Sequence, residues 1–234
     1  MPLDPAQRID LWKAAVNAVT KALSIVHHGS MLNERYLHHY LSRLLQESHP
    51  LLDLAGPTGD IKLHPEWPTF KKATGIEGGR YKGDRKVYQP DDVTGKEGAI
   101  DFALGDYDRP EIGIELLLKV GWDGDEVAFD FLKLLDGRNK SFKSVIGWSV
   151  LMRKAEKLSL AGRKQNIYEG MKKALQAAKT MLAACPCPLD RRCVFIVSEI
   201  AKQDRRHWYW DSEKEDFVPT EGTPPVLTAG TQES

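Results

Sequence analysis

Two apolar stretches near the middle of the chain each carry a single acidic residue, and they constrain the fold more than any other feature. Residues 98–104 read Gly-Ala-Ile-Asp-Phe-Ala-Leu, with Asp101 inside the apolar run. In residues 111–120 the apolar positions alternate, which places Glu115 on the opposite face of a strand. An Asp-rich turn joins the two stretches, so the pattern predicts a β-hairpin. Burying a carboxylate costs several kcal/mol without a counter-charge, so both acids require a cation or hydrogen bonds nearby.

The segments around this hairpin predict an α/β fold in which helices flank a mixed β-sheet. We expect one domain over residues 1–222, followed by a flexible tail at 223–234. Within the domain we expect N-terminal helices at 1–48, an irregular insertion at 50–98, and a core of sheet and helices at 99–212. The predicted core elements are a helix at 126–138, a strand at 143–152, a helix at 165–184, a strand at 193–198 and a last, edge-type strand at 207–210.

Composition narrows the class of protein. No stretch approaches the roughly 18 apolar residues of a membrane span, and the N-terminus does not resemble a signal peptide. Three cysteines in one short segment are typical of a reducing compartment, so we expect a cytoplasmic protein without a membrane partner. The net charge is +0, but residues 133–173 hold eleven Lys or Arg against three Asp or Glu. This segment is either a surface for a polyanion, with Arg138, Lys140 and Lys143 as candidate phosphate contacts, or merely a solvated surface.

The motifs Gly98-Ala99-Ile100-Asp101 and Ile112-Gly113-Ile114-Glu115 resemble those of the PD-(D/E)xK nuclease superfamily, which includes many restriction endonucleases. The resemblance implies a restriction-endonuclease-like mixed sheet in the order helix-strand-strand-strand-helix-strand. It also implies that Asp101 and Glu115 hold Mg²⁺, with Mn²⁺ as a substitute, and that the backbone carbonyl of Leu116 is a further ligand. Glu34, on the second N-terminal helix, would position a metal-bound water.

The chain departs from this superfamily at its lysine. The superfamily's lysine lies two residues after the glutamate, where this chain has Leu117. Lys119 lies on the same face of the strand, and Lys133 lies on the following helix, to which some superfamily members have moved this residue. We favour Lys133, whose ammonium would orient the attacking water or stabilise the transition state.

The resemblance implies a Mg-dependent nuclease that acts on DNA and could form a homodimer. The alternative is a catalytically inactive nuclease-like fold that serves as a nucleic-acid-binding or protein-scaffold subunit. A third reading makes Asp101 and Glu115 parts of a structural salt-bridge network, with Lys119, Lys133 or Arg138 as partners. Glu34 also has a purely structural explanation, because the helix dipole favours an acidic residue in the first turn of a helix. The histidines at 27, 28, 38 and 39 lack the spacing of a metal motif, so we expect no metal site from them.

Overall fold

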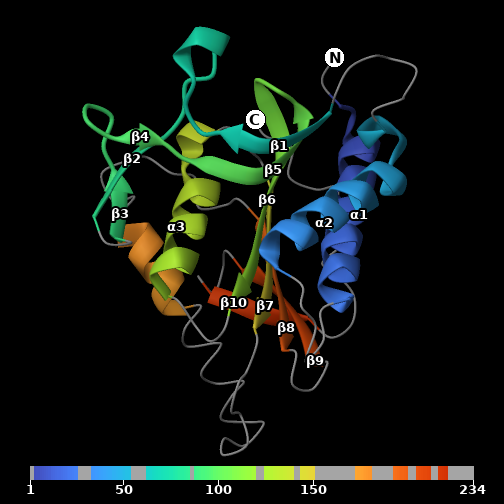
Figure 1. The fold of residues 1–234 in the computed structure, drawn as a ribbon. Helices are drawn as coiled ribbons and strands as arrows, with labels where there is room; N and C mark the ends of the chain where they lie inside the picture. The colour runs from blue at the N-terminus through green and yellow to red at the C-terminus, as the bar shows by residue number, and fades with distance from the viewer. Residues whose placement is uncertain are drawn as a thin grey trace, which may run out of the picture.

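A computed structural model of the chain contains helices on both faces of a large sheet (Figure 1). It describes residues 3–25, 33–53, 62–84, 87–119, 124–139, 143–150, 172–180, 192–199, 204–211 and 216–220. The helices are α1 (Pro5–Ser24), α2 (Glu34–Ser48), α3 (Gly124–Leu135) and a segment at 172–180, with the 3-10 turns η1 (Pro50–Leu52), η2 (Lys72–Thr74) and η3 (Gly137–Asn139). The strands are β1 (Leu63–Pro68), β2 (Arg80–Asp84), β3 (Val87–Pro90), β4 (Lys96–Glu97), β5 (Ala99–Asp106), β6 (Arg109–Lys119), β7 (Lys143–Val150), β8 (Arg192–Glu199), β9 (Asp204–Asp211) and β10 (Asp216–Thr220).

The large sheet has seven strands in the order β1-β5-β6-β7-β8-β9-β10. Strands β1, β5 and β6 are antiparallel neighbours, β6, β7 and β8 run parallel, and β8, β9 and β10 are again antiparallel. The sheet is therefore mixed, as predicted. Strands β2, β3 and β4 form a separate small antiparallel sheet.

Helices α1 and α2 cover one face of the large sheet and form the main hydrophobic core with it. Helix α1 begins at Pro5 with a capping box in which Asp4 and Gln7 exchange hydrogen bonds with each other's backbone. Helix α2 begins after Asn33, whose Oδ1 accepts from the Tyr36 N–H at 2.9 Å. The core joins the buried faces of both helices to the apolar face of β6, as the alternation predicted: Leu11, Trp12, Val16, Leu37, Leu41, Leu45, Ile112, Ile114 and Leu116.

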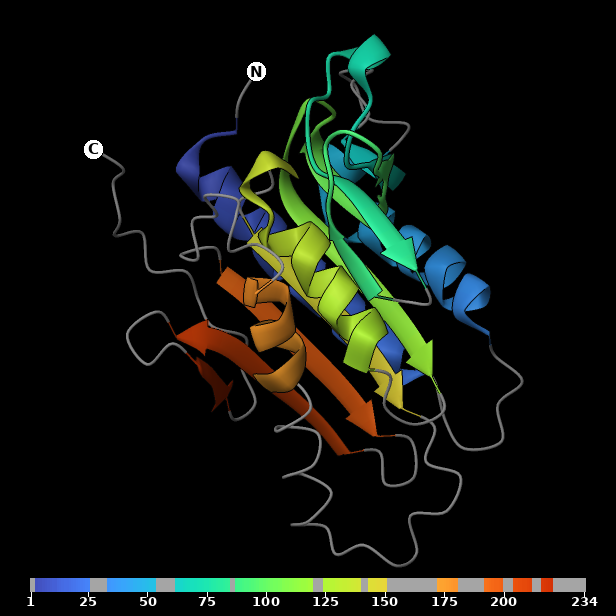
Figure 2. The same ribbon diagram turned by 90° about the vertical axis from the view of Figure 1, so that its left-hand side faces the viewer.

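Helix α3 lies on the opposite face, beside the helical segment 172–180 (Figure 2). A buried polar network joins the end of α3 to the small sheet. The Tyr81 hydroxyl donates to Asp136 Oδ2 at 3.0 Å and accepts from Asn139 Nδ2 at 2.7 Å. Asn139 Oδ1 in turn accepts from the Gly79 N–H at 2.7 Å, close to the Thr69 hydroxyl that accepts from Gly98 N–H. The network therefore fixes α3 relative to the start of β5.

Two sequence-based expectations are corrected by the fold. The segment 50–98 is not an irregular insertion, because it contains β1, which belongs to the large sheet, and all three strands of the small sheet. Residues 207–210 are not in an edge strand, because β9 lies between β8 and β10.

Other expectations hold or lie outside the described residues. The hairpin of β5 and β6 is confirmed, with a β-bulge at Leu104 and Gly105, where φ is 111° and a Cβ would approach the Glu111 backbone nitrogen to 2.9 Å. Of the predicted helix at 165–184 only residues 172–180 are described, and they are helical. The tail at 223–234 is not described. No helix in the described ranges is long and apolar enough to cross a bilayer.

Candidate active site

The candidate site begins where β5 and β6 separate. Their ladder runs from Asp106↔Arg109 to Phe102↔Ile114, whereas β6 continues along β7 as far as Lys119. Beyond Ile114 side chains replace the missing strand partner: Leu116 N–H donates to Asp101 Oδ2 at 2.8 Å, and Leu118 N–H donates to Glu34 Oε2 at 3.2 Å. Two carboxylates thus satisfy the free edge of β6, one from β5 and one from α2.

His38 brings α2 to the same point. Its Nε2 lies 3.3 Å from Asp101 Oδ2 and 3.5 Å from the Leu116 carbonyl oxygen, and its ring packs against Phe102 with centroids 5.7 Å apart. His38 follows Glu34 by four residues, so both side chains leave the same face of the helix. One helical face therefore supplies both polar groups that reach the fork between β5 and β6.

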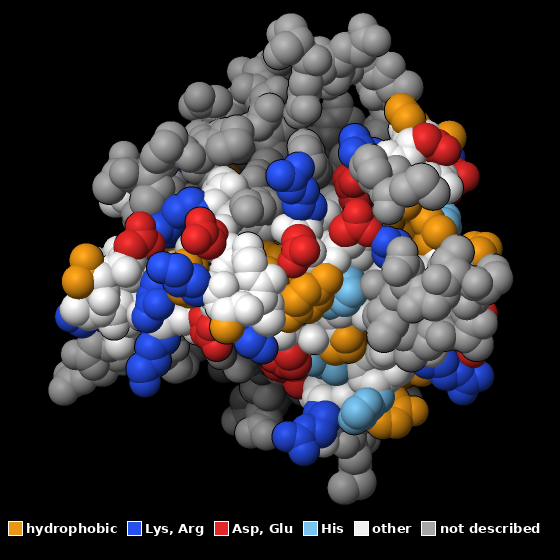
Figure 3. All heavy atoms as spheres, turned by 90° about the horizontal axis from the view of Figure 1, so that it is seen from above, with side chains coloured by type: hydrophobic (Ala, Val, Ile, Leu, Met, Phe, Trp, Pro, Cys, Tyr) orange, Lys and Arg blue, Asp and Glu red, His pale blue; other side chains and the backbone are white. Residues whose placement is uncertain are grey.

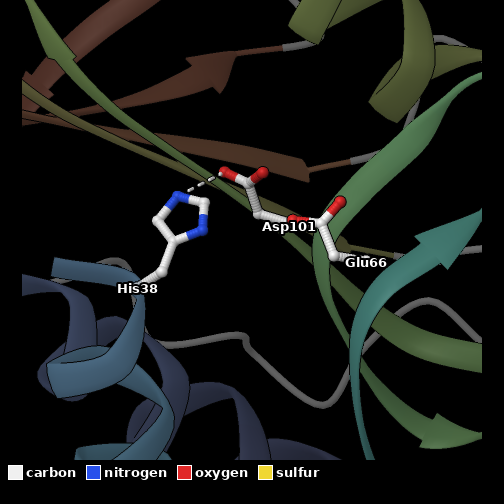
Figure 4. A group of neighbouring side chains, drawn as sticks. All are labelled: His38, Glu66 and Asp101. Atoms are coloured by element: carbon white, nitrogen blue, oxygen red, sulfur yellow. Dashed lines mark ion pairs between the residues drawn. The ribbon is translucent and has the colours of Figure 1, made fainter. Parts of the chain in front are cut away.

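Glu66 reaches the fork from the other side. The pairs Pro65↔Phe102 and Trp67↔Ile100 flank it, so Glu66 lies opposite Asp101 across the β1–β5 ladder (Figure 4). Its φ is 51°, a left-handed conformation that a residue other than glycine rarely adopts. Candidate ligand atoms of His38, Glu66 and Asp101 all lie within 4.8 Å of one another. These three side chains could hold a metal ion, whereas the spacing of the histidines in the sequence had predicted no metal site from His38.

Glu115 has different surroundings, on the α3 side of the sheet. It is 3% exposed and forms an ion pair with Lys133, which also pairs with Asp130 at 3.1 Å. Lys133 Nζ donates to the Ala99 carbonyl at 2.8 Å and lies 5.1 Å from the centre of the Phe129 ring. One ammonium therefore forms ion pairs with two buried carboxylates and a hydrogen bond with the first residue of β5.

Burial and charge determine the protonation of this cluster. Burial raises the pKa of Glu115 well above its usual range; Lys133 lowers it, and the charges of Asp130 and Asp101 raise it further. Burial lowers the pKa of Lys133, but the attraction of Glu115 and Asp130 outweighs burial, so its pKa is raised. Lys133 thus stays an ammonium ion at neutral pH. Asp101 contributes to both shifts, which couples the two sides of the site electrostatically.

On the open side, burial and the carboxylate of Asp101 shift the pKa of His38 in opposite directions. Burial lowers the pKa of His38, but the hydrogen bond and charge of Asp101, with smaller effects of Leu116 and Glu34, raise it above its ordinary value. No Lys or Arg forms a salt bridge with Asp101 or Glu66 in the described part of the chain. The ion-pair partner of the Asp101 carboxylate is therefore the imidazole of His38, and the Lys133 ammonium acts on Asp101 only from beyond salt-bridge distance.

The structure brings together most of the predicted site residues. Asp101, Leu116 and Glu34 meet at the fork, and Glu115 pairs with Lys133 of α3. Lys119 ends β6, but its side chain is outside the described atoms, as is that of Lys143, and Lys140 is not described. The Arg138 guanidinium bonds to Asp136 and Asp92, so its assignment as a phosphate contact stays a prediction.

The predicted basic surface is mostly outside the described residues, because positions 151–171 are among those not described. On the face in Figure 3, the described acidic and basic side chains are interspersed rather than separated by sign. The basic segment therefore remains a sequence-based argument.

Sequence reasoning missed His38, Glu66 and Asp130. A signal was available for His38 and Asp130: His38 lies four residues after Glu34, and Asp130 lies three before Lys133, spacings that put each pair on one helix face. Glu66 carries no such signal, because its partner Asp101 is distant in sequence and only the β1–β5 register joins them.

Comparison with known proteins identifies no family for this chain. No protein-family model matches the chain, and a search of curated proteins finds no similar sequence. The argument for function therefore depends on the site itself.

Proposed function

We propose that this protein is a metal-dependent nuclease that hydrolyses phosphodiester bonds of DNA, with a restriction-endonuclease-like core. The observation that carries the proposal is the position of Asp101 and Glu115 on adjacent strands, at the point where those strands separate. Apart from β2, β3 and β4, which form the separate small sheet between β1 and β5, the order α2-β1-β5-β6-α3-β7, with β6 and β7 parallel, agrees with the helix-strand-strand-strand-helix-strand order of the PD-(D/E)xK superfamily. This agreement in the order of elements supports the resemblance to the superfamily that the motifs around Asp101 and Glu115 indicate.

The donor set fits a divalent cation. Among the described residues, the Asp101 carboxylate contacts the Leu116 N–H and His38. Glu66 lies beside it and forms no salt bridge with a described residue. Asp101 would hold the ion, with the Leu116 carbonyl and Glu115 as the ligands on β6. Carboxylate and carbonyl oxygens suit Mg²⁺ and Mn²⁺. Such an ion lowers the pKa of a bound water and neutralises charge on the phosphate.

The protein's own residues would then orient the reaction. Hydrolysis joins a water oxygen to phosphorus and breaks the bond to the leaving oxygen, which takes up a proton. The Lys133 ammonium, held by Glu115 and Asp130, supplies a fixed positive charge toward the excess negative charge of the transition state. Glu34 keeps the edge of β6 in place through Leu118 N–H, so the carboxylates stay aligned.

One observation favours a second function, an inactive nuclease-like scaffold. Lys133 and Glu115 are 5% and 3% exposed, and each already has a charged partner. A closed ion-pair cluster of this kind can serve the fold alone. In that case the protein would bind nucleic acid or another protein without cutting DNA.

The test is cleavage of supercoiled plasmid and single-stranded DNA by the full chain, with Mg²⁺ or Mn²⁺, beside Asp101→Asn, Glu115→Gln and Asp108→Asn. Asp108 is exposed in the turn between β5 and β6, so Asp108→Asn is a matched control for Asp101→Asn. We expect Asp101→Asn to lose cleavage by roughly 100-fold or more and Asp108→Asn to stay within about 2-fold of wild type. If the folded wild type cleaves no DNA with either metal, the proposal of a nuclease is wrong and the inactive scaffold is the function that is left.

A further inference from the structure

We propose that His38 and Glu66 complete the metal site with Asp101, and that the site selects a first-row transition ion such as Mn²⁺ over Mg²⁺. This inference rests on the proposed function only in placing the metal beside the nuclease carboxylates. The ligands come from three elements, α2, β1 and β5, which the tertiary structure brings to one point (Figure 4). Neither His38 nor Glu66 belongs to the motifs on which the resemblance depends.

The spacing of the donors suits one ion. Two neighbouring ligands of an ion with bonds of about 2.1 Å stand about 3 Å apart in octahedral geometry. His38 Nε2 and Asp101 Oδ2 are 3.3 Å apart, close to that value without any rearrangement. Glu66 is exposed, and its ligand atom already lies within 4.8 Å of the other two. A rotation of this one exposed side chain would close the set.

The surroundings hold two of the ligands in place. Asp101 is anchored by the Leu116 N–H at 2.8 Å, and the His38 ring packs against Phe102. The backbone at Glu66 is fixed by its neighbour Trp67, which is buried and whose Nε1 donates to the Tyr107 carbonyl at 2.8 Å. A site whose backbone and two ligands are positioned in advance loses less entropy when an ion binds.

Charge also favours a cation here. Glu66 faces Asp101, a second carboxylate, and the described residues contribute no Lys or Arg salt bridge to either. Like charges this close repel each other, and the left-handed backbone of Glu66 maintains that approach. A divalent ion would replace the repulsion by attraction to both carboxylates.

The imidazole of His38 determines which divalent ion the site prefers. Mg²⁺ takes oxygen ligands almost exclusively, whereas the first-row transition ions also bind imidazole nitrogen, Mn²⁺ the least strongly of them. Two carboxylates and one imidazole therefore favour Mn²⁺ over Mg²⁺, and His38 is the residue responsible for the difference.

The test is a binding measurement that does not depend on catalysis. The full chain, stripped with EDTA, is titrated with Mn²⁺ and separately with Mg²⁺ by calorimetry, and bound Mn²⁺ is checked by electron paramagnetic resonance. The variants are His38→Gln, Glu66→Gln and Asp101→Asn, with His39→Gln as the matched control. His39 is adjacent on α2 but exposed, and it is not part of the ligand group. Far-ultraviolet circular dichroism verifies that each variant is folded.

We expect one Mn²⁺ to bind at least about 10-fold more tightly than Mg²⁺. His38→Gln should weaken Mn²⁺ binding about 10-fold or more and reduce the preference over Mg²⁺ toward none, because only the nitrogen donor is lost. Glu66→Gln should weaken both ions by similar factors, because both use its oxygen, and His39→Gln should change neither. No Mn²⁺ binding by the wild type, or an unchanged Mn²⁺ preference in folded His38→Gln, would overturn the site.

The two proposals fail separately. Selective Mn²⁺ binding without any DNA cleavage would support the site and overturn the nuclease. Cleavage whose dependence on Mg²⁺ and Mn²⁺ concentration is unchanged in both His38→Gln and Glu66→Gln would support the nuclease and overturn the site.

Discussion

The two acids that dominate the sequence lie on adjacent strands but in opposite surroundings. Asp101 is partly exposed, and its charged neighbours are an imidazole and the carboxylate of Glu66. Glu115 is buried and paired with Lys133, whose ammonium also serves Asp130. The Asp101 side is therefore open to a ligand, whereas the Glu115 side is closed by its own counter-charge.

Desolvation explains the difference. A carboxylate as buried as Glu115 requires a cation from the protein, because water cannot stabilise it. A carboxylate at the fork keeps contact with water, so its charge can remain available to a bound ion. If this is correct, substitutions on the Glu115 side should lower stability as well as cleavage, and substitutions on the Asp101 side should change metal binding and cleavage with little change in stability.

The largest effect on stability is expected from Lys133→Met. The substitution leaves Glu115 and Asp130 buried without their shared ammonium, which should lower the free energy of unfolding by about 3–5 kcal/mol. Urea denaturation of the wild type and the variant measures this loss in the free energy of unfolding. The double variant Lys133→Met/Glu115→Gln should recover part of the loss, because one unpaired charge is removed. A loss under about 1 kcal/mol in the single variant would show that the closed side contributes little to the fold.

Tyr81→Phe tests the polar network that anchors α3 on the same side. The variant removes the hydrogen bonds to Asp136 and Asn139, so we expect a loss of about 1–3 kcal/mol at pH 8. Burial raises the pKa of Tyr81 well above its ordinary value, and Asp136 adds to the rise. A raised pKa means that the stabilisation is present below the unfolded tyrosine's pKa of about 10 and is lost as pH rises beyond it.

The measurement for Tyr81 is urea denaturation of wild type and Tyr81→Phe at pH 8 and at about pH 10.5. The stability difference between the two proteins should be smaller at the higher pH, because ionisation of this tyrosine then stabilises the unfolded state of the wild type only. An equal or larger difference at high pH would mean that Tyr81 does not titrate as its burial requires.

Asn33→Ala tests the helix that carries Glu34 and His38 to the open side. Loss of the N-cap acceptor for the Tyr36 N–H should cost about 1 kcal/mol. Asn33→Asp keeps the acceptor and should stay within a few tenths of a kcal/mol of wild type. Thermal and urea unfolding measure both variants. Equal losses in the two would indicate that the cap is not what stabilises this helix.

Asp101→Asn should have the smallest effect on stability and a large effect on function. Asparagine keeps an oxygen acceptor for the Leu116 N–H and loses only the attraction to His38, which solvent screens in part. We expect a change under about 1 kcal/mol in urea denaturation of the metal-free protein. A loss comparable with that of Lys133→Met would place Asp101 among the structural residues and remove the contrast between the two sides.

Local pattern was enough for the hairpin, for Glu34 in the first turn of α2 and for the two faces of β6, because each depends on residues close in sequence. It failed for β1, which contains Pro65, Pro68 and a left-handed Glu66 and therefore lacks a strand pattern. Only the pairing with β5, distant in sequence, makes this segment a strand.

The sequence by itself determined that Asp101 and Glu115 would lie on paired strands, and it offered Lys133 as a partner on the next helix. Only the tertiary structure decided that Lys133 pairs with Glu115 and that Asp101 lies with His38 and Glu66 instead. The physical reason is that alternation along a strand depends on local geometry, whereas the counter-charge of each acid depends on which helix packs over it. That packing follows from burial of the α1, α2 and α3 faces, which no short motif encodes.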